Sequence, residues 1–258
     1  MAGTHAQVFE LLNNWFNHIY LVTIKRATQR HTEVTKALHG LNFSFMYGAD
    51  CKQFTLEQVT QNGLYNEEKA RKNHRYQKPM PAPAIGCSWS HRMVYEDILA
   101  KGYQRVLILE DDVRLNTAGA PLLSIALTML PPNWQMLWLD YDKNEKRGWG
   151  GLAKQSWYHV QRSIGKLNYT HNTIRNLYAV PVNDYWLRAG YHDFSNAYAL
   201  TACGAKALLA LQTPIQFTAD NLLAYASTNY LLQAYCIRPK LFYQTSQTTH
   251  KGESLINP

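Results

Sequence analysis

"HIYLVTIKRATQRHTEVTKALHGLNFSFMYGA", residues 18–49, decides the fold class of this chain. Its first part, residues 18–24, is rich in β-branched and aromatic side chains and predicts a buried strand. Residues 25–38 then predict a helix with Thr28 as its cap, and residues 43–49 predict a second strand. A strand, a helix and a second strand in this order are typical of a parallel sheet covered by helices.

Strands and helices continue to alternate along the rest of the chain, with two exceptions. Residues 66–83 are polar, basic and punctuated by proline, and they predict a surface insertion or mobile loop. Residues 143–175 have weak hydrophobic periodicity and many Gly, Trp and Tyr. This is typical of a segment that folds over a ligand, or of an irregular surface segment. The further elements that we expect are helices within 6–16, 84–102 and 121–134, strands within 105–115 and 134–142, a strand and a helix within 196–214, and a helix and a strand within 217–237.

Composition narrows the function classes. Apolar residues make up 46% of the 258, which allows a sizeable core, and the net charge of +8 favours anionic partners such as nucleotides, nucleic acid or an acidic membrane. No nucleic-acid-binding motif is present, so we expect no nucleic-acid partner. The four scattered cysteines exclude a C-x-x-C zinc site and favour a reducing compartment.

Neither a signal peptide nor a stretch of roughly 18 apolar residues appears in the sequence. We therefore expect a soluble protein that is at most peripherally attached to a membrane. The chain also has no internal repeat and no clear linker, so we expect one domain over residues 1–258.

The most informative site signal is "RVLILEDDVRL", residues 105–115. Three carboxylates, Glu110, Asp111 and Asp112, follow an apolar run that reads as a buried strand. Ligands bind beyond the carboxyl ends of strands in α/β sheets, and acids there commonly hold a divalent cation. The alternative is that the three acids cap the next helix or face solvent.

Four segments in this order resemble glycosyltransferase family 25. They are "YLVTIKRATQR" at 20–30, "GCSWSH" at 86–91, "VLILEDDVRL" at 106–115 and "NAYALTACGAKALL" at 196–209. The family includes bacterial lipooligosaccharide galactosyltransferases and collagen hydroxylysine galactosyltransferases. The resemblance implies a GT-A-like domain with a mixed, mostly parallel sheet flanked by helices. It covers residues 18–255 and leaves 1–17 as an N-terminal helical extension.

The resemblance also implies an activity. We expect an inverting transfer of a hexose, often galactose, from a UDP-sugar to a glycan hydroxyl, as in lipooligosaccharide synthesis, with Mn²⁺ or Mg²⁺ as cofactor. By analogy Asp112 and Asp111 are metal ligands, and Glu110 or Asp111 reaches metal-bound water or ribose. His250, in the C-terminal segment, is the remaining metal candidate, although a histidine in a polar tail is often simply exposed.

Residues after the first two strands correspond to the nucleotide-binding edge of the family. Ile24, Lys25, Arg26 and Arg30 follow the first strand there and are the candidates, the alternative for Arg30 being a surface pair with Glu33. Asp50 is expected to hold uracil or ribose, unless it is only a turn residue.

The helix that carries "GCSWSH" supplies further candidates. Ser90 and His91 are expected near the phosphates or the acids, although a lone histidine is usually structural. Cys87 is interpreted as a small packed residue because no histidine is paired with it in the sequence.

An inverting transfer needs a base for the acceptor hydroxyl. The candidates are Asp220, which follows Pro214 as a family acid does, and Asp140; the alternative for Asp220 is the N-cap of a helix over 221–225. Further candidates for contacts to sugars are Asp193, Asn196, Trp149, Trp157 and Tyr158.

Two other classes compete with a transferase. One is a nucleotide-sugar hydrolase or nucleotidyltransferase that uses the same acids, and the other is a non-catalytic glycan-binding module. The basic stretch 66–78 departs from the family pattern and is a candidate for binding an anionic acceptor or lipid headgroups. We expect the protein in the cytoplasm, with possible peripheral contact at the inner face of the cytoplasmic membrane.

Overall fold

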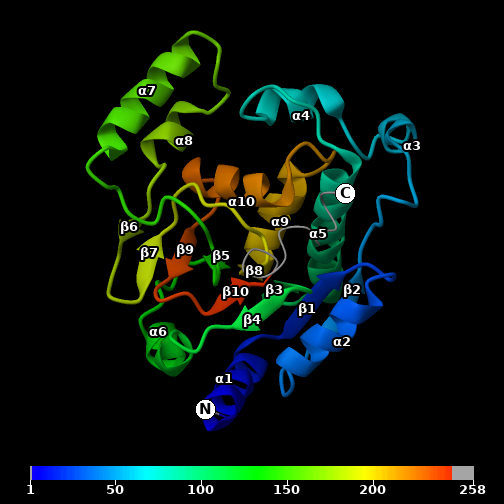
Figure 1. Ribbon diagram of the computed structural model, residues 1–258, viewed down its shortest axis with the longest axis vertical. Helices are drawn as coiled ribbons and strands as arrows, with labels where there is room; N and C mark the ends of the chain where they lie inside the picture. The colour runs from blue at the N-terminus through cyan, green and yellow to red at the C-terminus, as the bar shows by residue number, and fades with distance from the viewer. Residues whose placement is uncertain (1, 246–258) are drawn as a thin grey trace.

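The computed structural model describes residues 2–245, and their fold is built on one large sheet (Figure 1). In this part of the chain the sheet has eight strands in the order β2-β1-β3-β8-β5-β9-β7-β6. Strands β8 and β7 run opposite to the other six, so the sheet is mixed and mostly parallel, as predicted. The strands are β1 (His18–Thr23), β2 (Ser44–Tyr47), β3 (Arg105–Glu110), β5 (Met136–Trp138), β6 (Val180–Pro181), β7 (Trp186–Arg188), β8 (Ala197–Thr201) and β9 (Ala234–Ile237).

Helices cover both faces of this sheet. Along β1, Ile19 and Leu21 face a core shared with α1, α2 and α6, while Tyr20 and Val22 face a core shared with α5, α9 and α10. Successive side chains of a strand point to opposite faces, so a strand buried on both faces must be apolar throughout. These helices are α1 (Ala2–Trp15), α2 (Thr28–Ala37), α5 (Ala82–Lys101), η1 (Ala120–Leu122), α6 (Leu123–Thr128), α9 (Ala202–Leu211) and α10 (Ala219–Thr228).

A separate two-stranded antiparallel sheet brings together two distant parts of the chain. Strand β4 (Val113–Leu115) directly follows the acidic triplet and pairs antiparallel with β10 (Phe242–Gln244). This strand pair therefore holds the end of the described chain close to the carboxyl end of β3. The predicted metal ligand His250 lies outside the described residues.

The prediction of a surface insertion or mobile loop over residues 66–83 is confirmed in part: most of these residues are exposed or half-buried, but the stretch is not a loop throughout. Helix α4 (Glu67–Asn73) occupies the first half of this stretch, and α3 (Leu56–Gln61) precedes it. The side chain of Asn66 caps α4 by accepting a hydrogen bond from the Lys69 amide. Acids in the first turn and bases in the last turn complement the helix dipole, so capping and charge order, rather than apolar periodicity, define this helix.

The expected cap of α2 is also wrong, because Ala27 is the N-cap and Thr28 is the first helical residue. Residues 143–175, which showed weak periodicity, contain α7 (Gly151–Ser163) and α8 (His171–Arg175). Helix α8 packs against both α7 and α10, and α7 lies at the upper left of Figure 1, across from α4. Within residues 2–245, none of the helices combines the length and the apolar character that a membrane span requires.

Candidate functional site

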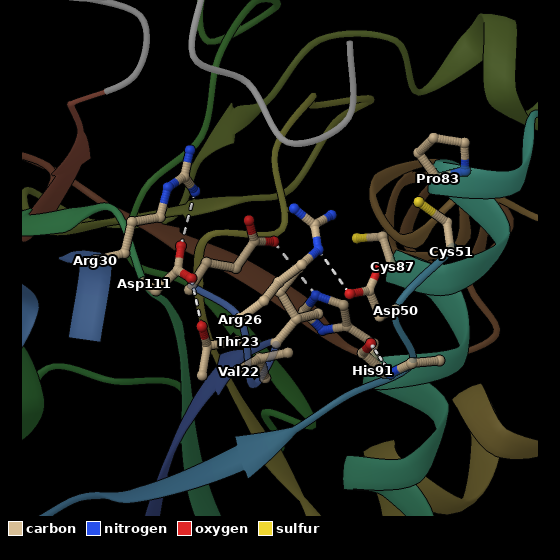
Figure 2. A pocket seen from close by; sticks show the side chains of 14 residues that line it. Val22, Thr23, Arg26, Arg30, Asp50, Cys51, Pro83, Cys87, His91 and Asp111 are labelled. Carbon is tan, nitrogen blue, oxygen red and sulfur yellow. Dashed lines mark hydrogen bonds and ion pairs between the residues drawn. The ribbon is translucent and has the colours of Figure 1, made fainter. Parts of the chain in front are cut away.

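A pocket opens at the carboxyl ends of β1, β2 and β3 (Figure 2). Because β1 runs parallel to both neighbours, with Val22 beside Glu110, the residues that follow all three strands meet at one edge. The first turns of α5 close the opposite wall. The lining consists of Val22, Thr23, Ile24, Arg26, Arg30, Ala49, Asp50, Cys51, Pro83, Cys87, Ser90, His91, Glu110 and Asp111. We call it the arginine pocket.

Helix α5 approaches the end of β2 closely enough to require glycine. A Cβ atom on Gly86 would lie 2.8 Å from the carbonyl oxygen of Ala49. The Ser90 hydroxyl donates to the Gly86 carbonyl (2.7 Å) and accepts from the Ala49 amide (3.0 Å). Ser90 therefore lines the pocket and fastens α5 to the segment after β2 through its bond with Ala49, whereas its bond to Gly86 stays within α5.

Each of the three acids of the triplet has its own set of hydrogen-bond partners. Glu110 accepts hydrogen bonds from Ser195 (2.8 Å) and His91 (3.3 Å), both at Oε1. Asp111 accepts from the Arg30 guanidinium (Nη1 to Oδ1, 2.9 Å) and from the Thr23 hydroxyl. Internal donors therefore offset the repulsion between these neighbouring carboxylates.

Asp112 is adjacent to Asp111 but is not a lining residue of the arginine pocket. Its Oδ2 atom accepts a hydrogen bond from Gln244 Nε2 (2.9 Å), and its carbonyl oxygen accepts from the Thr245 amide (3.0 Å). Asp112 thus holds the end of β10 against the turn that follows β3.

His91 belongs to a buried hydrogen-bonded chain. Its Nδ1 atom lies 2.7 Å from the Tyr198 hydroxyl, which in turn lies 3.1 Å from the Tyr95 hydroxyl. Burial raises the pKa of Glu110, but the hydrogen bond from His91 and nearby positive charge outweigh this effect, so the net pKa lies below the ordinary value. Glu110 is therefore ionised at neutral pH, and His91 orients it.

Not all of the residues predicted at the nucleotide-binding edge line the arginine pocket. Ile24, Arg30 and Asp50 line the arginine pocket, whereas Lys25 is absent from its lining and faces a neighbouring depression. Arg30 pairs with Asp111 and not with Glu33. Burial lowers the pKa of Arg30, but Asp111, Asp112 and Glu110 together raise it more, so the guanidinium stays charged.

Of the two neighbouring basic residues after β1, Arg26 lines the arginine pocket and Lys25 does not. The Nε atom of Arg26 donates to Asp50 Oδ2 at 2.6 Å (Figure 2). Burial raises the pKa of Asp50, yet the hydrogen bonds from Arg26 and from the Lys52 amide lower it overall. Two arginines, each paired with a carboxylate, therefore line one pocket. The choice between Lys25 and Arg26 depends on the direction of the turn after β1, which the sequence does not reveal.

A second pocket, which contains Asp220, adjoins the first. Both pockets are lined by Cys87 and Glu110, so they meet at these two side chains. Burial raises the pKa of the Cys87 thiol well above its usual value, so it stays protonated and is no nucleophile. The other lining residues are Ala84, Phe194, Ser195, Asn196, Thr218, Ala219, Asp220, Asn221 and Gln244. We call this the Asp220 pocket.

Asp220 is not the N-cap of its helix. The N-cap of α10 is Thr218, whose hydroxyl donates to Asp220 Oδ1 (2.6 Å), as does the Asn221 amide (2.8 Å). Both hydrogen bonds fall on one oxygen, so within the described chain Oδ2 remains available for another donor. Burial raises the pKa of Asp220. This carboxylate therefore has the free oxygen and the raised basicity that a general base needs.

Asp140 lines neither pocket. Its Oδ2 accepts a hydrogen bond from Asn196 Nδ2 (2.7 Å), and its Oδ1 accepts from the Tyr141 amide (2.9 Å). This contact fixes the orientation of the Asn196 amide, because only its NH₂ group can donate to a carboxylate. Asn196 Oδ1 is buried and has no hydrogen-bond partner among residues 2–245. Asp140 therefore positions an unsatisfied acceptor in the wall of the Asp220 pocket.

Comparison with known proteins adds the family. The model of glycosyltransferase family 25, described as an LPS biosynthesis protein family, matches residues 16–223. This chain belongs to glycosyltransferase family 25. The four segments that suggested the resemblance lie within the match, and they include the pocket-lining residues Ile24, Arg26, Arg30, Cys87, Ser90, His91, Glu110 and Asp111.

Two curated family 25 relatives come from mosquitoes. A "Glycosyltransferase 25 family member" of Anopheles gambiae is 27% identical over 259 residues, which cover 92% of this chain and 38% of that protein. One of Aedes aegypti is 29% identical over 101 residues, covering 38% of this chain and 16% of that protein. The chain thus spans about two fifths of the length of the first. Among solved structures, apo mouse xyloside xylosyltransferase 1 aligns over 88% of this chain and 77% of its own, with 9% identity and a TM-score of 0.41.

The family 25 site contains one possible metal-binding group among the described residues. Ligand atoms of Cys87, His91 and Glu110 lie within 4.8 Å of one another. The raised pKa of the Cys87 thiol makes this a poor site, because a metal needs the thiolate. The acids of the triplet fit Mn²⁺ or Mg²⁺ better, since both ions prefer carboxylate oxygens. Of these acids, Glu110 and Asp111 line the arginine pocket.

Ser195 and Gln244 are among the pocket residues that sequence reasoning missed. Ser195 donates to Glu110, and Gln244 joins Asp112 to the lining of the Asp220 pocket. Neither belongs to a motif. The sequence points to Ser195 only because it precedes the candidate Asn196. It points to Gln244 only because this residue begins the polar C-terminal segment.

Proposed function

We propose that this family 25 domain transfers a hexose from a UDP-sugar to a hydroxyl of a glycan acceptor, with inversion at the anomeric carbon. The observation that carries the proposal is the junction of two pockets at Cys87 and Glu110. One pocket offers arginines beyond the ends of parallel strands, as a nucleotide diphosphate requires, and the other contains a buried carboxylate. The proposed donor sugar is galactose, and the proposed acceptor is a glycan of the lipooligosaccharide type.

In this proposal the arginine pocket binds the UDP portion of the donor. A guanidinium has five N–H donors, so Arg26 has donors beyond its contact with Asp50 that can bind phosphate oxygens, and Arg30 adds positive charge to the same pocket. Asp50 and the backbone around Ile24 lie at the rim where uracil and ribose would bind. The hexose then projects past Glu110 toward the Asp220 pocket.

Asp220 acts as the general base in the proposed reaction. The acceptor hydroxyl oxygen forms a bond to the anomeric carbon, the bond from that carbon to the UDP oxygen breaks, and UDP leaves with the bonding electrons. The hydroxyl proton passes to Asp220 Oδ2. Before transfer, the same hydroxyl or a neighbouring one donates a hydrogen bond to Asn196 Oδ1, which satisfies this buried acceptor.

A divalent cation, Mn²⁺ or Mg²⁺, is part of the proposal. Glu110 and Asp111 would hold it in the arginine pocket, with Asp112 and His250 as the further ligands suggested by the family resemblance. When bound, the ion supplies positive charge that neutralises the diphosphate and so favours its departure. Arg30 and Thr23 would exchange their hydrogen bonds to Asp111 for this ion.

The test uses UDP-galactose, UDP-glucose and UDP-N-acetylglucosamine, each with and without a glycan acceptor, and measures UDP release. Acceptor-dependent release from one donor is the expected result. Release that does not depend on an acceptor would assign the domain to the hydrolases instead. Binding of glycan without UDP release or UDP binding would assign it to non-catalytic glycan-binding modules.

Peripheral contact with an anionic membrane belongs to the same proposal, and α7 supplies a surface for it. Trp149, Leu152, Trp157, Val160 and Ile164 recur at helical spacing along α7 and its ends, and all are exposed. The surrounding stretch 146–183 contains six Lys and Arg residues and no Asp or Glu. Exposed tryptophans flanked by bases are typical of helices that lie in a membrane interface.

A further inference from the structure

A third cavity continues from the Asp220 pocket along α10. It has a volume of about 440 Å³, within the range of roughly 300–1,000 Å³ that is usual for ligand pockets. Helix α4 forms one wall, the end of α7 and the start of α8 form the other, and α10 forms the floor. We call it the α4–α10 groove.

The groove and the Asp220 pocket share Asn221, the residue next to Asp220. Asn221 Oδ1 accepts a hydrogen bond from the Tyr191 hydroxyl (2.6 Å), which fixes both side chains where the two cavities meet. Because the Asp220 pocket in turn meets the arginine pocket, the three cavities form one path. A molecule whose hydroxyl group reaches Asp220 would therefore extend into the α4–α10 groove.

Aromatic rings form the walls of the groove. The rings of Tyr169 and Tyr191 lie 4.9 Å apart, and those of Phe217 and Tyr225 lie 4.8 Å apart. Rings with a polar handle offer both an apolar face and a hydrogen-bonding edge. This combination suits a saccharide, which presents C–H faces and hydroxyl groups together.

The charge of the groove is positive. Lys72 at the end of α4 and Arg162 near the end of α7 line it, and among the described residues no carboxylate does. Arg162 is held in place by bonds to the Tyr169 carbonyl (2.9 Å) and to His171 (2.8 Å). These contacts leave further guanidinium N–H groups for a ligand. An anionic group is therefore favoured over a neutral or cationic one.

We propose that the α4–α10 groove is an acceptor subsite for an anionic saccharide. Sugar rings pack against Tyr169, Tyr191 and Tyr225, and a carboxylate or phosphate on the saccharide binds Lys72 and Arg162. This inference rests on the proposed transferase function and specifies the class of acceptor.

Direct binding tests the inference without relying on transfer. Saturation-transfer NMR titrations compare lactose with 3′-sialyllactose, and trehalose with trehalose 6-phosphate, on the intact chain at low ionic strength. Each anionic sugar is expected to bind about tenfold more tightly than its neutral partner, since two partly exposed ion pairs contribute about that factor together. A preference confined to one anionic sugar supports the proposal and identifies its anion as carboxylate or phosphate.

The double variant Lys72→Gln/Arg162→Gln is expected to remove this preference and to leave UDP affinity unchanged. The matched control is Lys36→Gln/Lys206→Gln, which removes two exposed charges from α2 and α9 and should keep the preference. Equal binding of neutral and anionic sugars, no binding of either anionic sugar, or a preference that survives in the Lys72/Arg162 variant would overturn the inference. Failure of UDP to bind the unmodified chain would instead count against the proposed function.

Discussion

The arginine pocket and the α4–α10 groove handle positive charge in opposite ways. In the arginine pocket Arg30 and Arg26 are paired with Asp111 and Asp50 at 2.9 Å and 2.6 Å. In the groove Lys72 and Arg162 are lining residues, and no described carboxylate shares the lining. Because the cations of the first pocket are paired with carboxylates, they also stabilise the fold. Those of the second have no described carboxylate in the lining and remain available mainly for a ligand.

The largest expected effect falls between the two regions, at Asp220. Asp220→Asn should lower the transfer rate by about 10²–10⁴-fold, because general-base catalysis typically contributes that factor. UDP affinity should remain unchanged, since Asp220 does not line the arginine pocket. Steady-state kinetics and UDP titration measure both quantities. Asp184→Asn, a change at an exposed acid, is the control, and normal turnover in Asp220→Asn would remove this residue from the role of base.

Breaking the Arg30–Asp111 pair should weaken both UDP binding and the fold. Arg30→Met leaves the buried Asp111 carboxylate without its charged donor, which costs about 1–3 kcal/mol of unfolding free energy. Adding Asp111→Asn should restore stability but not UDP affinity. By contrast, Lys72→Gln should change the unfolding free energy by less than about 0.5 kcal/mol. Urea denaturation of the four proteins measures this difference, and equal losses for Arg30→Met and Lys72→Gln would contradict the comparison.

Stability of the Asp220→Asn variant should depend on pH. Because burial raises the folded-state pKa of Asp220 above its unfolded value, ionisation at neutral pH destabilises the fold of the unmodified chain. The variant should therefore melt at a higher temperature at pH 7. Its advantage should shrink as the pH falls through the raised folded pKa and vanish below the unfolded pKa. A gain that is independent of pH would indicate a packing effect instead.

The smallest expected effect concerns the exposed face of α7. Trp149→Ser/Trp157→Ser should reduce binding to vesicles of mixed neutral and acidic lipid by about three- to tenfold, because each indole adds interfacial burial. Transfer to a soluble acceptor should not change. Vesicle co-sedimentation measures the binding, and Leu122→Ser, at an exposed apolar residue on η1, is the control. Equal binding of all three proteins would exclude α7 as the contact.

Sequence patterns predicted the region around the arginine pocket well. Strands such as β1 and β3 are buried on both faces, so a continuous apolar run identifies them and locates the residues at their ends. The acidic triplet and Asp50 were located in this way, whereas Arg30 was a candidate because of the family resemblance. The helix α4 was missed, because its signals are a cap and an order of charges, and a search for apolar periodicity passes over both.

The sequence by itself determined an α/β fold with a mostly parallel sheet, membership of family 25 and an acidic edge at the end of β3. Local sequence is enough for the strands and the acidic edge, since burial on two faces and residues adjacent to a strand are properties of short segments, and four motifs in order indicated the family. Only the tertiary structure decided the partners of the acids, the junction of the pockets at Cys87 and Glu110, and the α4–α10 groove. These depend on side chains far apart along the chain, such as Asp112 with Gln244 and Lys72 with Arg162, and packing of the elements brings them together.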